Sequence, residues 1–168
     1  MHHKSWSALN QQLSQFLCDT LKGKITYSLT RYHKVHNSYG KASILYQKKV
    51  IVNFTWNQGQ NQESYLSDQV KENPSLSYRQ ILDQTSDETL YSENLISEND
   101  FLDQVQTFLN QSIDDSIRST KIIILILAIM DRRVGQRTLA NQEILANPLF
   151  QNLLVNQVYQ LRIHTTLE

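Results

Sequence analysis

Residues 122–130 read IIILILAIM and are followed directly by DRRVGQR at residues 131–137. A run of nine apolar residues is too short to cross a bilayer, which takes about 18 to 20 residues of helix. Such a run is instead buried on every side, as a helix or as a strand. Ser119 or Thr120 offers an N-cap before it, and the arginines after it suit the negative end of a helix dipole. We therefore predict a central core helix that begins at Ile122.

The N-terminal third of the chain predicts one helix followed by three strands. Apolar residues spaced by three and four positions indicate an amphipathic helix, and they are Trp6, Leu9, Leu13, Phe16 and Leu17. After Gly23 the pattern changes to a period of two, rich in β-branched and aromatic residues. This pattern predicts strands at residues 24–33, 41–47 and 50–56. Short turns between the strands make neighbours antiparallel, so we expect a three-stranded meander with the first helix against one face.

The C-terminal half predicts helices. Ser97 and Asp100 resemble a capping box before a helical apolar pattern, and Gly135 is expected to close the helix that contains the apolar run. The pair Asn147-Pro148 predicts the start of a last helix, whose expected buried residues are Leu149, Leu153, Leu154, Val158 and Leu161.

The predicted fold class is therefore α+β: an N-terminal helix packed on a three-stranded antiparallel β-meander, followed by a helical C-terminal half. A chain of 168 residues fits one domain. We predict a single domain over residues 1–168. Within it, residues 5–56 form the helix and meander, 57–96 an acidic and loosely structured connection, and 97–165 the helical part.

Charge is segregated along the chain, although the formal net charge is zero. Residues 1–56 carry a net +7, residues 57–115 a net −10 and residues 116–168 a net +3. The acidic middle either packs near the basic ends and neutralises them, or leaves a charged face that steers a partner.

Cys18 is the only cysteine, so the chain forms no internal disulfide. It falls on the buried side of the first predicted helix, which indicates a core thiol rather than a nucleophile. No apolar leader with a cleavage site follows Met1, and we expect a cytoplasmic protein.

Two basic clusters are the candidate binding sites. The first is the Asp-Arg-Arg stretch with its following arginine: Asp131, Arg132, Arg133 and Arg137. If the helix continued, Arg133 and Arg137 would share a face and bind phosphate or carboxylate. Asp131 and acids of the middle block would otherwise pair with these guanidiniums and serve structure alone.

The second cluster ends the first predicted strand, and its members are Arg31, His33, Lys34 and His36. Its two histidines lack the further spaced ligands that zinc takes, so we predict no metal site. Basic residues interleaved with tyrosines at a sheet edge also suit single-stranded nucleic acid, although tyrosines serve more often as cross-strand pairs. The four glycines are not clustered and no Gly-x-Ser-x-Gly occurs, which argues against familiar enzyme classes. We predict no cofactor.

Four landmarks occur in order along the chain: W-S-x-L at 6–9, F-L-C-x-x-L-K-G at 16–23, R-Y-x-K-x-H at 31–36 and D-R-R-x-G-x-R at 131–137. Together they resemble the landmarks of a family of small uncharacterised bacterial cytosolic proteins. The resemblance covers roughly residues 5 to 140, implies a bacterial and cytosolic setting, and carries no activity. Gln136 stands where lysine is expected, which weakens any reading in which each cation of that stretch contacts phosphate.

We predict a non-enzymatic protein-binding module, for which an immunity-type inhibitor of a toxin is one candidate. The alternative is a nucleic-acid-binding protein that uses the basic clusters at 31–36 and 132–137, although a neutral pI of 7.0 is unusual for such a domain. An enzyme of unrecognised class is the third hypothesis.

Overall fold

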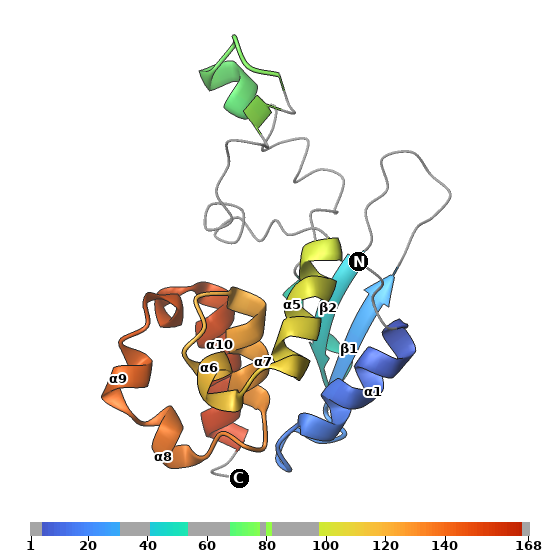
Figure 1. Cartoon of the computed structure of the whole chain (residues 1–168), viewed down its shortest axis with the longest axis vertical. Coiled ribbons are helices and arrows are strands. Elements are labelled where there is room, and N and C mark those ends of the chain that lie inside the picture. Colours follow the sequence, from blue (N-terminus) through green and yellow to red (C-terminus); the bar gives the residue numbers. More distant parts are fainter. Residues whose placement is uncertain (1–4, 31–40, 54–67, 78–79, 82–97, 166–168) are drawn as a thin grey trace.

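The structure is a computed structural model, and it describes residues 5–30, 41–53, 68–77, 80–81 and 98–165. Its architecture is α+β: an N-terminal helix, a three-stranded antiparallel sheet and a helical C-terminal half (Figure 1). The predicted fold class is confirmed. None of the helices in these described ranges combines the length and apolar character that a membrane span requires.

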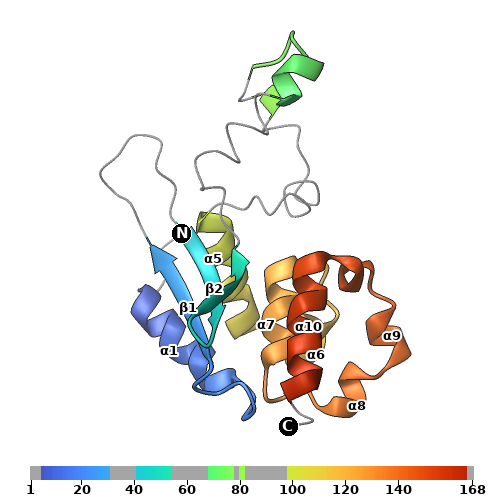
Figure 2. The same cartoon turned by 180° about the vertical axis from the view of Figure 1, so that it is seen from behind.

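Helix α1 (Trp6–Phe16) begins at Ser5, whose side chain accepts a hydrogen bond from the Ala8 backbone N–H. Its buried stripe packs on strand β1 (Ile25–Thr30) and on helix α5 (Glu98–Asn110), and the views from both sides place α1 and α5 against the same face of the sheet (Figures 1 and 2). Aromatic pairs join the two helices, since the ring centroids of Phe16 and Phe108 lie 6.3 Å apart. The amphipathic pattern of the first helix is thereby explained.

The sheet has the order β1, β2 (Lys41–Tyr46) and β3 (Lys49–Asn53), with both pairings antiparallel. The core face follows the predicted period of two, because Tyr27 pairs with Ile44 and Ile44 with Val52. Strand β1 begins one residue later than predicted, β2 ends one residue earlier and β3 begins one residue earlier. The predicted ends at 31–33 and 54–56 lie outside the described residues.

Helix α7 (Ile122–Met130) is the centre of the helical half, and all nine of its residues are buried. It packs against α5, α6 (Ile113–Ile117) and α10 (Leu153–Thr165). The predicted core helix is confirmed, but its predicted cap is wrong. Lys121 occupies the N-cap position without a side-chain cap, and the side-chain oxygen of Gln104 instead accepts from the Ile123 backbone N–H at 3.2 Å.

Three short elements join α7 to α10: α8 (Gln136–Leu139), α9 (Gln142–Leu145) and the 3-10 turn η1 (Pro148–Gln151). Gly135 is the N-cap of α8 and does not close α7, which already ends at Met130. Asn147 opens only η1, because Asn152 provides a second cap by accepting from the Leu154 backbone N–H at 2.9 Å. The predicted helix start is therefore five residues too early, since α10 begins at Leu153.

The predicted burial of the last helix is wrong at Leu153 and only partly met at Leu149 and Leu161, which are partly buried against the core. Leu153, in its first turn, is 78% exposed, whereas Leu154 and Val158 are buried. The buried stripe of α10 continues to Arg162 and Thr165, two polar residues that the apolar pattern did not include.

Candidate functional site

A short antiparallel backbone contact ties the end of α1 to the end of α7. Leu17 and Asp131 form an isolated bridge, flanked by hydrogen bonds from Cys18 N to Met130 O at 2.9 Å and from Arg132 N to Phe16 O at 2.7 Å. Both backbone segments are extended here, so α7 ends at Met130 and the arginines lie beyond the helix. The predicted continuous helix that would align Arg133 with Arg137 is not formed.

Asp131 is a buried carboxylate that binds its neighbour Arg133. It is 1% exposed, and its Oδ1 accepts from the Arg133 backbone N–H at 2.7 Å and from Nε at 3.0 Å, while Oδ2 accepts from Nη2 at 2.7 Å. This hydrogen bonding is the main cause that raises the pKa of Arg133. The guanidinium also lies over the Phe16 ring, 4.1 Å from its centroid. The predicted pairing of Asp131 with an arginine is confirmed for Arg133.

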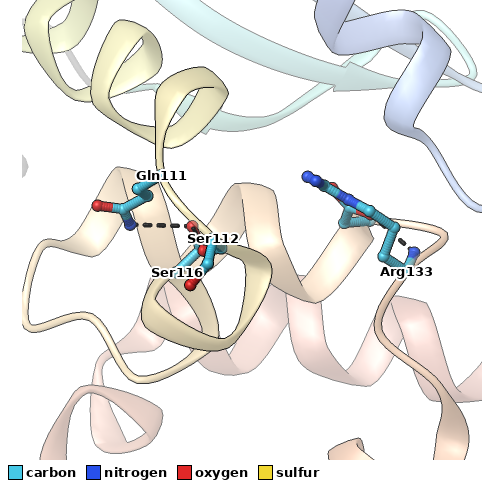
Figure 3. Close-up of polar contacts among 5 residues, drawn as sticks. Gln111, Ser112, Ser116 and Arg133 are labelled. Carbon is cyan, nitrogen blue, oxygen red and sulfur yellow. Dashed lines mark hydrogen bonds and ion pairs between the residues drawn. The ribbon is translucent and has the colours of Figure 1, made fainter.

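Figure 3 shows the Arg133 side chain lying along the loop that follows α7. The same view shows Gln111, which follows α5, pointing toward Ser116 on α6, and their side chains are joined by a hydrogen bond of 2.9 Å. Ser116 also donates to the Ser112 carbonyl and is fully buried, so this group of polar residues fastens α5 to α6.

A second arginine, absent from the predicted sites, secures the same loop from α10. Arg162 is 6% exposed and donates from Nε to the Ile129 carbonyl at 3.1 Å and from Nη2 to the Val134 carbonyl at 2.9 Å. The Ile129 carbonyl belongs to the last turn of α7, where a cation is favourable. The sequence does indicate that Arg162 is buried, because it lies four residues after Val158 and so falls on the apolar stripe of the helix.

Tyr27 and Cys18 lie in the core beside Asp131. Burial raises the pKa of Tyr27 well above its usual value, with smaller contributions from the charges of Asp131 and then Cys18. The Cys18 thiol is buried and lies 3.4 Å from the Thr20 hydroxyl. These groups belong to the protein interior.

Beside this interior lies an open hollow of about 720 Å³, and its lining residues are Gln11, Ser14, Gln15, Leu17, Lys22, Gly23, Ile25 and Arg132. We call it the α1 hollow. It brings together Lys22 and Arg132, which are separated by more than a hundred positions in the chain. Neither cation forms an ion pair within the described part of the protein. Lys22 reaches this place through the turn at Gly23, which has a positive φ of 77°.

The predicted cluster at 131–137 therefore divides into separate parts. Arg133 is held by Asp131, Arg132 lines the α1 hollow, and Arg137 is exposed on α8 outside that lining. Lys22 was not predicted, because nothing in its local sequence links it to Arg132. The other predicted site residues lie outside the described residues, and they are Arg31, His33, Lys34 and His36.

Among the described residues, no three His, Cys, Asp or Glu side chains lie close enough together to hold a metal ion. One family model, described as the SF0329 protein family, matches residues 5–163. The match extends from the N-cap of α1 almost to the end of α10. No curated protein and no solved structure matches the chain.

Proposed function

We propose that this chain, which belongs to the SF0329 protein family, is a non-enzymatic protein-binding module of the bacterial cytoplasm. The observation that carries the proposal is the α1 hollow, where Lys22 and Arg132 face an open space without an acid of the described chain to neutralise them. Exposed cations of this kind steer a partner of opposite charge and fix its register.

The rigid support behind the hollow favours binding over a passive surface. The backbone of Arg132 is fixed by its bond to the Phe16 carbonyl, and the next two residues are held by Asp131 and Arg162. Preorganised groups lose little conformational freedom on association, so more of the interaction free energy remains as affinity. A small protein that must capture one partner tightly, such as an immunity-type inhibitor of a toxin, benefits from this arrangement.

The chemistry of the lining supports a role without catalysis. Its residues provide two cations, a hydroxyl, two amides and two apolar side chains, but no carboxylate, imidazole or thiol. General acid–base catalysis near neutral pH commonly uses such titrating groups. The nearby phenol and thiol of Tyr27 and Cys18 are buried, so substrate in the hollow does not reach them.

Site-specific photo-crosslinking in the native host tests the proposal. A benzophenone amino acid replaces Ser14, which lines the α1 hollow and is exposed, and in a control it replaces Gln157, an exposed residue of α10. We expect one stoichiometric protein adduct from position 14 and none from position 157. The adduct should be lost when Lys22 and Arg132 are changed to Glu, but retained when the exposed cations Lys49 and Arg118 are changed to Glu.

Two results would contradict the proposal. The first is the absence of a protein adduct at position 14, and the second is an adduct that persists in the Lys22→Glu, Arg132→Glu variant. Toxin neutralisation is then tested by expressing the adduct's partner with and without this chain in a heterologous host. If the partner does not inhibit growth when it is expressed alone, the immunity role is rejected and the protein-binding role is kept.

Nucleic-acid binding is the second candidate, because phosphate groups are recognised by the same pair of cations as carboxylates. It predicts affinity that falls steeply as salt rises, since bound counterions are released. The informative variant is Arg132→Gln with Lys22→Gln, because Arg133 is already bound to Asp131 and its removal disturbs the loop. Salt-sensitive binding of an oligonucleotide that this variant loses would favour the second candidate over the first.

A further inference from the structure

The polar side of α1 carries two glutamines one helical turn apart. Gln11 and Gln15 are exposed, line the α1 hollow and make no side-chain hydrogen bond within the part of the chain that the structure describes. Ser14 lies between them but already donates to the Asn10 carbonyl at 2.9 Å. The two glutamine amides are therefore the groups on this wall that are available to a ligand.

The spacing and chemistry of these amides match a peptide backbone. Residues four apart on a helix have Cβ atoms about 5 to 6 Å apart, and an extended chain repeats its groups on one side every two residues, about 6.6 to 6.8 Å. A primary amide both donates and accepts, as a peptide group does. Gln11 and Gln15 can thus contact alternate peptide groups of one extended segment.

The cations of the hollow determine the charge of that segment. Arg132 offers a planar fork that suits a carboxylate, and Lys22 offers a second, more mobile charge. Leu17 and Ile25 also line the hollow but are only 3% and 7% exposed, so they offer little apolar surface to a ligand. The lining contains no aromatic ring on which a nucleobase would stack.

We infer that the α1 hollow binds an extended acidic segment of a protein partner, with a glutamate or aspartate carboxylate between Lys22 and Arg132 and peptide groups on Gln11 and Gln15. This inference rests on the proposed protein-binding function and specifies the chemistry of the partner. Charge complementarity selects the segment, and the two amides select a peptide over another polyanion.

Fluorescence anisotropy with the full chain tests the inference. The probe is a terminally blocked, labelled octapeptide of alternating Glu and Ser, compared with an octapeptide of alternating Gln and Ser and with a labelled octathymidylate. We expect saturable binding of the acidic peptide alone. Arg132→Gln and Lys22→Gln should each weaken it about tenfold, the effect of losing one charge-assisted hydrogen bond.

A second pair of variants tests the amides without changing charge. The double change Gln11→Ala, Gln15→Ala should weaken the acidic peptide about fivefold, since two neutral hydrogen bonds are removed. The matched control is Gln157→Ala with Gln160→Ala, two exposed glutamines of α10, which should bind as the parent does. Circular dichroism establishes that each variant is folded, and alanine favours helix at all four positions.

Three results would overturn the inference: no binding of the acidic peptide, binding unchanged by both charge variants, or octathymidylate binding equally well through Lys22 and Arg132. The crosslinking experiment separates this failure from a failure of the proposed function. A charge-dependent protein adduct at position 14 together with an inert acidic peptide means that a protein binds in the hollow through different chemistry. An absent adduct removes both proposals.

Discussion

Two consecutive arginines lie in opposite environments. The Arg133 guanidinium donates hydrogen bonds to the buried Asp131 carboxylate and packs on the Phe16 ring, whereas Arg132 lines the open α1 hollow with Lys22. We call Asp131, Arg133 and Val134, with their contacts to Phe16 and Arg162, the locked loop. The single carboxylate of this stretch, Asp131, pairs with Arg133 and not with Arg132. Arg133 therefore has a structural role, and Arg132 is left available for binding.

The comparison also separates contributions to the free energy of folding from contributions to the free energy of binding. In the locked loop, the Asp131 carboxylate and the Arg162 guanidinium are buried and hydrogen-bonded, so removing a partner leaves a buried polar group without compensation. In the α1 hollow, charges remain hydrated, so they contribute little to folding and much to the recognition of a partner. Variants of the two regions should therefore have opposite effects on stability and on binding.

The largest expected effect is the loss of stability from Arg133→Ala. The Asp131 carboxylate would remain buried without its guanidinium, and the free energy of unfolding should fall by about 3 kcal/mol. Urea unfolding measures the change. Arg132→Ala is the matched control, and we expect it to stay within about 0.5 kcal/mol of the parent because its exposed side chain forms no ion pair within the described chain.

A double variant identifies the origin of that loss. Asp131→Ala combined with Arg133→Ala removes the buried charge together with its partner, so it should be more stable than Arg133→Ala alone by about 1 kcal/mol or more. A double variant that is less stable than the single one would show that Asp131 stabilises the loop without the guanidinium, through its bond to the backbone N–H of residue 133, and that an unpaired carboxylate is not the origin of the loss.

The next effect in size belongs to the second arginine that holds the locked loop. Arg162→Met keeps most of the buried volume but removes the donors to the Ile129 and Val134 carbonyls. Leaving these carbonyls unsatisfied should lower the free energy of unfolding by about 2 kcal/mol. Arg162→Lys retains the charge without the planar fork and should lie between methionine and the parent in the same urea titration. Equal stability of all three proteins would contradict the role assigned to Arg162.

Alkaline pH tests the interior beside Asp131. The pKa of Tyr27 is raised in the folded protein above the ordinary value of 10.0, so its contribution to stability is complete below pH 10 and is lost as pH rises further. At pH 11 the loss should reach about 1.4 kcal/mol, the equivalent of one pH unit. Urea unfolding at pH 8 and pH 11 measures it. Between pH 8 and pH 11 the free energy of unfolding of Tyr27→Phe should fall by about 1.4 kcal/mol less than that of the parent. Equal falls in the two proteins would refute the assignment to Tyr27.

Much of the fold follows from the local spacing of apolar residues, because buried positions recur with a fixed period in helices and strands. The apolar run at 122–130 has no polar side to expose, so it forms the central helix α7, and the period of two after Gly23 gives the core face of the meander. The errors arise where distant groups supply what local sequence usually supplies. Gln104 satisfies the start of α7 from another helix, and Asn152 adds a cap that moves the start of α10.

The candidate site was less predictable than the fold for a related reason. The letters Asp-Arg-Arg indicate that one pairing is available, but which arginine binds Asp131 depends on the extended backbone bridge to Leu17. Lys22 joins Arg132 only because that bridge places the end of α1 beside the end of α7. Long-range pairing of backbone segments leaves no periodic signal, so neither choice could be predicted.

The smallest expected effect concerns the α1 hollow itself. Changing Lys22 and Arg132 together to Gln removes two like charges that have no acid partner within the described chain, so the free energy of unfolding should change by less than about 0.5 kcal/mol. Any change should be toward greater stability, because mutual repulsion is relieved, and it should shrink as salt screens the parent. Parallel urea titrations at low and high salt measure both quantities. A loss of 1 kcal/mol or more would place these cations with Arg133 as structural groups and would remove the contrast between adjacent arginines.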